Sequence, residues 1–417
     1  MVEDFAFLNT DSFPKEINKA KIKDIFEILL SQKRPDLVKE MKTLLKFKMA
    51  KKDKRMNVEQ KKVNVQSINQ VLPTEMLTKI LEFLDVKSLC FAKQSCKHWK
   101  VIIDELELVK KATSRLSCLL IAGGAKSLKD RDHGVPEAEI IIGDLQTIQL
   151  PNLPEKVYHS SMVLCNETVL LCGGLNNELK CLQLDHGTWK EHSRLNEVRV
   201  WHSAVTTQKA TFLFGGSFSR TTYEYLPKDS TTWVMGKTKI PGYGYDDGCA
   251  IAAKSEQEIW LIGGAFCTLN RILSFNVNEH TFKVWHAQLN IGRFGHNCAF
   301  IPNSNNIMIT GGYGGVYHSD DLDSTEILNT EDGSITMGSS MNFKRTHHGM
   351  DFVTINGEDR LAVFGGTNSR DLDCVEVYNT QTKKWEITSI KMKEPKMGFG
   401  YLSMKLSLAN ELLNLSL

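Results

Sequence analysis

The feature that most restricts the fold of this chain is a glycine doublet that recurs six times after residue 115. The doublets begin at Gly123, Gly173, Gly215, Gly263, Gly311 and Gly365, with steps of 50, 42, 48, 48 and 54 residues. Each doublet closes a mainly apolar run, as in "TVLLCGG" and "EIWLIGG". Such a run followed by Gly-Gly is typical of a buried strand with a tight exit at positive φ. The sequence therefore predicts six similar strands at a regular spacing.

Two further features repeat in phase with the doublets. Two bulky residues seven positions apart flank a polar turn, as in "YNTQTKKW" from Tyr378 to Trp385. The other pairs are Ile141/Ile148, Leu182/Trp189, Leu226/Trp233, Phe275/Phe282 and Leu328/Ile335. A short strand led by a basic or aromatic residue follows, as in "RVWHSAVTT" and "RFGHNCAF". Four short antiparallel strands per repeat and a period near 50 residues predict a mainly β protein, a six-bladed β-propeller.

The count of strands predicts how the ring closes. Six doublet strands need six innermost partners, and five of these precede their own doublets, near Tyr158, Trp201, Gly248, His296 and His348. The stretch before Gly123 offers no such strand. We therefore expect "GFGYLSMKL", residues 398–406, to complete the first blade and remove the open edge.

The repeated Gly-Gly, Tyr and Trp positions resemble the kelch repeat. The resemblance covers residues 115–406 and implies a kelch-type propeller of six blades. The first and fifth blades depart from it, because Ile141/Ile148 and Leu328/Ile335 stand where Tyr and Trp are expected.

A helical stretch, "VLPTEMLTKILEFLDVKSLCFAKQSCKHWKVIID", precedes the repeats from Val71 to Asp104. Pro73 suits the first turn of a helix, and Ser88 suits the N-cap of a second one. Apolar residues follow a helical period in both halves. Roughly 33 residues cannot bury so much apolar surface alone. The stretch is then either a helical hairpin docked on the propeller or a module whose core is completed by a partner.

The same stretch resembles the F-box at its usual spacing, with Leu72-Pro73, Glu75, Leu77, Ile80, Phe83-Leu84, Leu89, Cys96-Lys97 and Trp99. Ser95 departs from the apolar residue usual there. The resemblance implies docking on the Skp-type adaptor of an SCF-type cullin–RING ubiquitin ligase, while the propeller captures a protein substrate. Carried onto this chain, the adaptor-binding residues are Leu72, Pro73, Leu77, Ile80, Leu84, Leu89, Cys96 and Trp99.

The charge of the chain is concentrated at its N-terminus. Residues 1–70 carry 16 Lys and Arg against 10 Asp and Glu, and the whole chain carries only +2. The stretch from Lys46 to Arg55 is either a nuclear import signal or a solvated linker. We expect a basic helical N-terminal segment (1–68), an F-box (69–112), the propeller (115–406) and a C-terminal tail (407–417).

The sequence offers no sign of catalytic chemistry. The ten cysteines lack zinc spacing, and the nucleophile and phosphate-loop motifs are missing. For the adjacent His347 and His348 we expect one ring in the channel and one packed, rather than a metal site. The N-terminus lacks a signal-peptide pattern, and no apolar run approaches 18 residues. We expect a cytoplasmic protein, which would also be nuclear if the stretch from Lys46 to Arg55 is an import signal, and we expect no cofactor, metal, nucleic acid or membrane partner.

The kelch resemblance implies that substrate meets two loop positions at one end of the propeller. Residues after the doublets supply Phe218, Phe266, Tyr313 and Asn368, and residues leading the innermost strands supply Trp201, Phe294 and His347, with Tyr158 and Tyr245 nearby. Arg220 and Arg370 could recognise a carboxylate or phosphate. The plainer alternative is that half of the aromatic residues pack between blades and the arginines are solvated.

These observations predict a non-catalytic substrate receptor of a ubiquitin ligase. The main alternative is a kelch-propeller scaffold with a cytoskeletal or regulatory role, and a propeller enzyme is a distant third.

Overall fold

The computed structural model describes residues 77–78, 81–82, 84, 89–90, 92–93, 97–126, 134–218, 220–242, 249–264, 269–314, 320–355 and 357–413. The chain divides into two compact units, residues 1–115 and 116–417.

The first unit contains helices α6 (Lys97–Glu105) and α7 (Leu108–Arg115). Helix α6 buries Trp99, Ile102 and Ile103 at three- and four-residue spacing, while Val101 on the other face is 49% exposed. The alternation of buried and exposed positions is that of an amphipathic helix.

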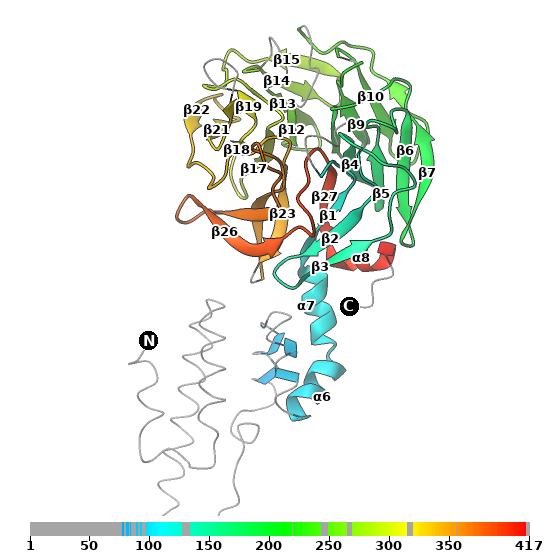
Figure 1. Ribbon diagram of the computed structural model, residues 1–417, viewed down its shortest axis with the longest axis vertical. Helices are drawn as coiled ribbons and strands as arrows, with labels where there is room; N and C mark the ends of the chain where they lie inside the picture. The colour runs from blue at the N-terminus through cyan, green and yellow to red at the C-terminus, as the bar shows by residue number, and fades with distance from the viewer. Residues whose placement is uncertain are drawn as a thin grey trace, which may run out of the picture. The chain divides into compact units, whose positions relative to one another are not determined.

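The second unit is built from six antiparallel sheets of four strands each within the described residues (Figure 1). Blade 1 contains β27 (Gly400–Lys405), β1 (Ser117–Ala122), β2 (Ala138–Ile142) and β3 (Gln146–Leu150). Blade 2 contains β4 (Ser161–Cys165), β5 (Thr168–Cys172), β6 (Lys180–Asp185) and β7 (Thr188–Arg194). Blade 3 contains β8 (Ser203–Thr206), β9 (Ala210–Phe214), β10 (Tyr223–Pro227) and β11 (Val234–Met235).

The other three blades follow the same order. Blade 4 contains β12 (Ala250–Ala253), β13 (Glu258–Ile262), β14 (Ile272–Asn276) and β15 (Thr281–Val284). Blade 5 contains β17 (Asn297–Phe300), β18 (Asn306–Thr310), β21 (Thr325–Asn329) and β22 (Ile335–Met337). Blade 6 contains β23 (Gly349–Ile355), β24 (Glu358–Phe364), β25 (Cys374–Asn379) and β26 (Lys384–Lys391). A small sheet of β16 (Arg293–Phe294), β19 (Tyr313–Gly314) and β20 (Asp320–Asp321) extends blade 5.

The innermost strands form a closed ring. Strand β27 lies beside β4, and contacts continue through β8, β12, β17 and β23 back to β27. Strand β27 pairs with β1 over its whole length, from Ser117↔Lys405 to Ala122↔Gly400. The predicted six-bladed propeller and its closure by the C-terminal strand are therefore confirmed.

The predicted pairs of bulky residues are only partly right in register. Phe275↔Phe282, Leu328↔Ile335 and Tyr378↔Trp385 are direct cross-strand partners. In blade 2, Trp189 faces Leu184 instead of Leu182. The turn is shorter there, because Asp185 pairs with Thr188 in blade 2 whereas Asn379 pairs with Lys384 in blade 6, so the seven-residue spacing no longer marks the partner.

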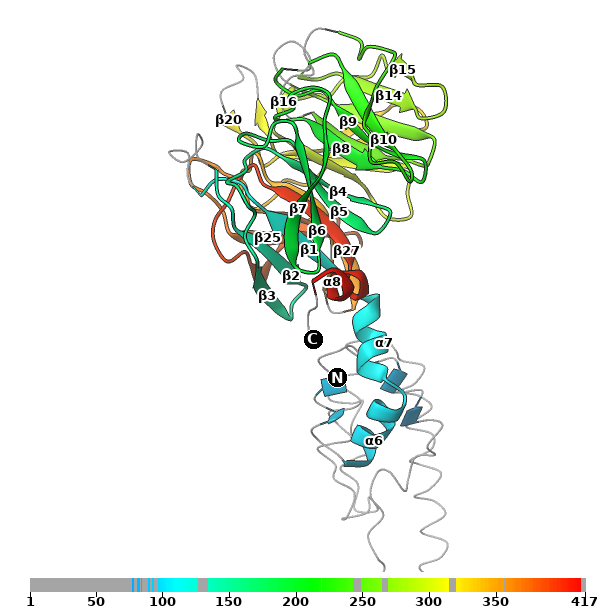
Figure 2. The same cartoon turned by 90° about the vertical axis from the view of Figure 1, so that its right-hand side faces the viewer.

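The segment expected as a tail forms helix α8 (Leu406–Leu413). Leu406, Ala409 and Leu413 are buried in the core cluster of blades 1 and 2, and the amide of Gly187 donates to the carbonyl oxygen of Leu412 at 2.8 Å. Figure 2 shows α8 directly after β27 at one end of the ring. Because these apolar residues are spaced i, i+3 and i+7, one face of the helix covers that core.

Buried ion pairs hold strands together in four blades. The basic residue four positions before the innermost strand, here called the clamp position, is Arg199, Arg293, Arg345 or Lys396, and all four are at most 2% exposed. Each pairs with a fully buried glutamate: Glu224 at 2.5 Å, Glu326 at 2.8 Å, Glu376 at 2.8 Å and Glu139 at 3.0 Å, respectively. The three guanidinium groups also donate through Nη1 to the first carbonyl of a glycine doublet, at Gly215, Gly311 and Gly365. Each of these three arginines therefore ties the segment before an innermost strand to the end of the strand that follows it.

Candidate binding site at the channel mouth

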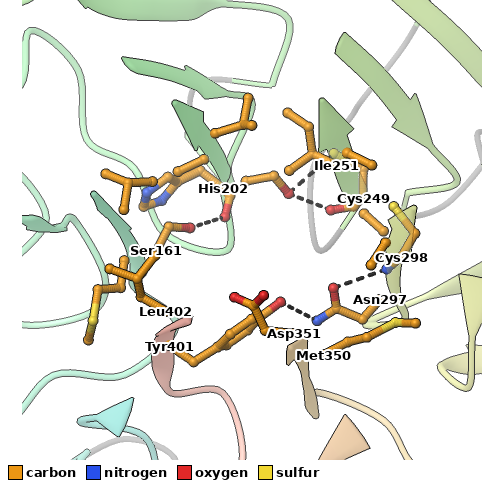
Figure 3. Close-up of a pocket in the computed structure, with 18 of the residues that line it drawn as sticks. Ser161, His202, Cys249, Ile251, Asn297, Cys298, Met350, Asp351, Tyr401 and Leu402 are labelled. Carbon is orange, nitrogen blue, oxygen red and sulfur yellow. Dashed lines mark hydrogen bonds between the residues drawn. The ribbon is translucent and has the colours of Figure 1, made fainter. Parts of the chain in front are cut away.

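A cavity of about 600 Å³ follows the axis of the ring. Its walls come from the six innermost strands, and Figure 3 shows their side chains arranged around the open centre. The cavity is mixed in character, with apolar residues such as Ile251 and Leu402 beside polar ones such as Ser161 and Asn297. The channel is therefore wide enough for a small group or one inserted side chain.

Polar side chains in the wall join neighbouring innermost strands. Ser161 Oγ donates to the carbonyl of His202 at 2.8 Å, and Asn297 Nδ2 donates to the carbonyl of His348 at 3.0 Å. Asn297 Nδ2 also reaches Tyr401 Oη at 2.6 Å (Figure 3). These bonds satisfy backbone groups on strand edges that face the channel instead of another strand.

Asp351 is the one carboxylate among the described residues that line the cavity. Its oxygens accept hydrogen bonds from the amides of Phe352 and Ser403, each at 2.8 Å. Burial raises the pKa of Asp351 to about 6, although the two amides oppose that shift. No lysine or arginine belongs to the described cavity lining, so the charge of Asp351 meets no cationic side chain there.

Three histidines directly before innermost strands are buried and neutral. Burial lowers the pKa of His202 and His296 to about 3, and the guanidinium groups of Arg199 and Arg293 add to the shift. Burial and Arg345 likewise hold the pKa of His348 well below its usual range. His348 Nε2 lies 2.9 Å from Thr310 Oγ1, while the adjacent His347 is half-buried at the channel mouth. The structure thus separates the two histidines as the sequence predicts.

The residue two positions after the clamp lies at one end of the channel and is here called the mouth position. Its described occupants are His159, Trp201, Gly295, His347 and Gly398, and their φ angles fall between 52° and 60°. Their backbones are linked in series: His347 N donates to Gly295 O, Gly398 N to His347 O, His159 N to Gly398 O and Trp201 N to His159 O, at 2.7 to 3.1 Å. This chain of hydrogen bonds fixes the rim of the channel.

Three aromatic rings converge over this rim. The ring centroids of His159 and Trp201 are 4.5 Å apart, and those of His159 and His347 are 4.9 Å apart. The rings of Trp201 and His347 are 17° from parallel, with centroids 6.5 Å apart. The glycines leave the space for this, because a Cβ on Gly398 would lie 2.7 Å from the His159 ring and one on Gly295 would lie 2.8 Å from the His347 ring.

Two sets of loop residues are predicted to meet substrate: those after the glycine doublets and those leading the innermost strands. Hydrogen-bonded bridges bring the two sets together at the mouth end of the channel. Phe294 pairs with Tyr313, Thr346 with Thr367 and Tyr158 with Leu175. The ring of Phe294 lies 5.4 Å from Tyr313 and 6.4 Å from His347. Trp201, Phe294, Tyr313 and His347 are all partly exposed. These four predicted residues therefore form one aromatic surface around the mouth.

The remaining predicted residues differ in their surroundings. Phe218 is 73% exposed and shares its loop with exposed Arg220, whose Nε donates to the carbonyl of Ser217 at 3.4 Å. Asn368 and Arg370 share a turn closed by a backbone bond of 3.0 Å. Tyr245 and Phe266 lie outside the described residues.

Tyr158 is misplaced in the prediction. It is only 2% exposed and packs with Ala125 and Met397, so it supports the rim from below. The adjacent His159 occupies the mouth position instead. Sequence reasoning missed it because blade 2 has Val157 at the clamp position, so no basic residue marks the start of its strand.

The residues predicted to bind an adaptor lie in the first unit. Leu77, Leu84, Leu89 and Trp99 are 1% to 7% exposed, so within this chain they belong to the interior of the helical segment. Val101 and Cys90 are exposed nearby in sequence. Leu72, Pro73, Ile80 and Cys96 lie outside the described residues.

Two features are absent from the described part of the chain. No group of three or more His, Cys, Asp or Glu side chains is placed to hold a metal ion. No helix there is long and apolar enough to span a membrane.

Comparison with known proteins identifies similarity in both units. The F-box-like family matches residues 70–114, and the Kelch motif matches residues 358–389, which cover β24, β25 and most of β26. A RING finger domain and kelch repeat-containing protein of Dictyostelium discoideum is 25% identical over 225 residues. The match covers 53% of this chain and 21% of that relative, so the chain spans about a fifth of the relative's length.

Proposed function

We propose that this chain, an F-box/kelch-repeat protein, is the substrate-recognition subunit of an SCF-type cullin–RING ubiquitin ligase. One observation supports this above all: an F-box-like segment and a closed propeller with a partly exposed aromatic mouth occur on the same chain. The first part would bind a Skp-type adaptor, and the second would bind a protein substrate. The Dictyostelium relative has a RING finger in its own name, whereas here the RING subunit would be supplied in trans through the adaptor and cullin.

In this role the chain holds the substrate in place, and the RING subunit and a conjugating enzyme perform the ubiquitin transfer. Holding the substrate beside the loaded conjugating enzyme makes a bimolecular encounter effectively intramolecular, with effective concentrations in the millimolar range for short flexible links (on the order of 1 mM). No side chain of this protein then needs to touch the reacting bond.

Substrate would bind at the channel mouth, because large exposed aromatic side chains are frequent anchors of protein interfaces. Phe218 at 73% exposure stands at the edge, and Trp201, Phe294 and Tyr313 surround the opening. Arginines 220 and 370 provide a charged rim. Apolar anchors with a polar rim are the usual composition of such an interface.

Co-purification tests the adaptor half of the proposal. The full chain should capture a Skp-type adaptor and a cullin from lysate, and a Leu72→Ala/Pro73→Ala variant should lose both. Val101→Asp should weaken capture about tenfold or more, because a carboxylate replaces an apolar side chain 49% exposed on α6. Val284→Asp is the matched control, since Val284 is 47% exposed on β15 of the propeller, and it should change nothing.

Failure of the intact chain to bind adaptor or cullin would overturn the proposal. The chain would then act as a kelch-propeller scaffold with a cytoskeletal or regulatory partner. If the adaptor binds, a proximity-labelling comparison with and without proteasome inhibition should reveal substrates that accumulate only under inhibition.

A further inference from the structure

One layer of the central channel places an acidic side chain among apolar ones. The layer consists of the third residue of each innermost strand, and all six of these residues line the cavity. Five blades supply an apolar residue and blade 6 supplies the acid: Leu402, Val163, Val205, Ala252, Ala299 and Asp351. Because five blades close the ring with an apolar residue at this position, closure alone does not require a carboxylate in the sixth.

The carboxylate of Asp351 retains acceptor capacity on its channel side. An ionised carboxylate offers roughly four acceptor positions, and the amides of Phe352 and Ser403 occupy one on each oxygen. Burial and the charge of Asp351 raise the pKa of the Tyr401 hydroxyl, so the two groups lie within electrostatic reach of each other. Figure 3 shows both side chains at the edge of the open centre. A donor in the channel therefore finds free acceptor positions on this carboxylate.

The charges around the layer favour a cationic ligand. The four basic residues at the clamp position lie at the mouth end, but each pairs with a fully buried glutamate at 2.5 to 3.0 Å, so their charges are compensated. The buried histidines directly before the innermost strands have pKa values well below the ordinary one and are neutral: His202, His296 and His348. No lysine or arginine belongs to the described lining. A charge of one sign between low-dielectric walls attracts a ligand of the opposite sign.

A second cavity reaches this layer from the end of the ring opposite the mouth. Its volume is about 660 Å³, and it shares Ala253, Phe300 and Phe352 with the lining of the channel. Phe352 directly follows Asp351 in β23, and one step along a strand is about 3.3 Å. The charged residues that line the second cavity are both paired, Lys254 with Glu258 at 3.7 Å and Asp359 with Lys405 at 3.1 Å. A ligand that enters from this end passes two phenylalanines before it meets Asp351.

The chemistry of the lining selects an ammonium group on an alkyl stem. Divalent metal ions require several oxygen ligands, and no group of three or more His, Cys, Asp or Glu in the described part of the chain is placed to hold one. A guanidinium binds best when both carboxylate oxygens are open to its planar fork, and each oxygen of Asp351 already accepts an amide. A primary ammonium is compact and has three donors, and apolar walls suit its stem.

We propose that the central channel binds a primary alkylammonium group at Asp351. The nitrogen donates to the carboxylate, and the stem packs against the apolar residues of the same layer. Two sources share this chemistry, a free small amine and a lysine side chain of a bound protein. The inference is independent of the ligase role and of the aromatic surface at the mouth.

The first test compares n-butylammonium with its neutral counterpart 1-butanol. The full chain carries ¹³C-labelled isoleucine and leucine methyl groups and is kept at pH 7.5, where Asp351 with its pKa of about 6 is ionised; tetramethylammonium chloride holds the ionic strength constant. Butylammonium should shift the signals of Ile251 and Leu402, which line the channel, and leave that of Ile387, 56% exposed on β26, unchanged. It should bind about tenfold or more tightly than butanol, because hydrogen bonds to charged groups are the stronger ones.

Equal affinities for the ammonium and the alcohol would overturn the proposal. Displacement of butylammonium by an equal concentration of potassium chloride would overturn it as well, in favour of an inorganic cation. N-acetyl-lysine amide then separates the two sources, since it carries the same ammonium on the same four-carbon stem attached to a peptide unit. If it binds within about threefold of butylammonium, the site accepts a lysine side chain of a partner, and if it is excluded, the site takes free amines.

Variants of Asp351 locate the site. Asp351→Asn removes the charge at nearly constant shape, and Asp351→Val introduces the residue that blades 2 and 3 use in this layer. Whichever variant folds, as its melting curve shows, should bind butylammonium and butanol equally. Asp359→Asn is the matched control, because Asp359 lines the second cavity and is paired with Lys405, and it should keep the preference for the ammonium. Preference retained without Asp351, or lost with Asp359, would contradict the assignment. Adaptor capture by the same samples should not change, so the channel site and the ligase role are tested separately.

Discussion

In the five blades where both are described, the clamp position and the mouth position lie two residues apart and have opposite properties. The clamp position is basic in four of its five described occurrences and fully buried, whereas the mouth position varies between glycine, histidine and tryptophan and is partly exposed in Trp201 and His347. Both lie at the same end of the ring. The clamp residue repeats from blade to blade because the fold needs it. The mouth residue varies, and a position that varies is where a particular partner can be recognised.

The physical reason lies in what each side chain must satisfy. A clamp guanidinium has to pair with a buried glutamate and cap a doublet carbonyl at the same time, as Arg345 does with Glu376 and Gly365. Leaving any of these groups unpaired in the interior is costly. The mouth position contributes its backbone to the rim and leaves its side chain free to vary.

The largest expected effect comes from removing both positions of one blade together with its inner strand. A chain ending at Pro395 lacks Lys396, Gly398 and β27, so β1 keeps a fully buried apolar strand with an unpaired edge. We expect aggregation and no cooperative melting of the propeller. Calorimetry and size-exclusion chromatography check this. A chain ending at Leu413, which keeps α8, is the control, and a soluble, cooperatively melting 1–395 chain would refute the closure argument.

The second largest effect on stability should come from breaking one clamp pair. Arg345→Val alone leaves Glu376 buried and unpaired, so it should lower the free energy of unfolding of the propeller by about 3–5 kcal/mol. Arg345→Val with Glu376→Leu should recover at least half of that loss. Blade 2 already uses this uncharged arrangement, with Val157 and Leu182 in one apolar cluster. Urea unfolding followed by near-ultraviolet circular dichroism measures both, and equal losses in the single and double variants would refute the clamp.

Much of the ring could be predicted because its repeated glycines are required by their backbone conformation. The doublet glycines all have φ between 59° and 129°, which only glycine adopts without strain, so their spacing survives in the sequence as a period. The glutamates of the clamp were missed because they follow their doublets at variable distances. Glu224 comes 9 residues after Gly215, whereas Glu326 comes 15 after Gly311. A fixed spacing exists instead to the bulky residue that follows, because each of these glutamates stands two residues before it, and this signal could have found them: Glu139/Ile141, Glu224/Leu226, Glu326/Leu328 and Glu376/Tyr378.

The mouth could be predicted only to within one residue. Trp201, Phe294 and His347 were found because a basic residue precedes each of them at the clamp position. Blade 2 lacks that marker, so the sequence places Tyr158 only near the equivalent position, one residue before His159. The clustering of His159, Trp201 and His347 depends on Gly398 lying between two of them in the ring, a contact between blades far apart in sequence. Local spacing contains no information on such a contact.

The smallest effect concerns a third position, one residue beyond the mouth, where His202 and His296 are buried with pKa values of about 3. In the unfolded chain a histidine binds its proton near pH 6.5. Below that pH the unfolded state therefore holds more protons than the folded state, and stability falls as pH decreases. Each histidine should reduce the free energy of unfolding by about 2 kcal/mol between pH 6.5 and pH 5, at 1.36 kcal/mol per unit.

Blade 1 provides the matched variant for this prediction, because Phe399 occupies the same position and packs on Gly365 as His202 packs on Gly173. His202→Phe should remove one histidine's share of the pH dependence and leave stability at pH 8 nearly unchanged. Unfolding in urea at pH 5, 6, 7 and 8 gives the slope for both proteins. If the free energy of unfolding has the same pH slope in wild type and His202→Phe, His202 is protonated in the folded ring. The third position would then resemble the variable mouth position and not the buried clamp position.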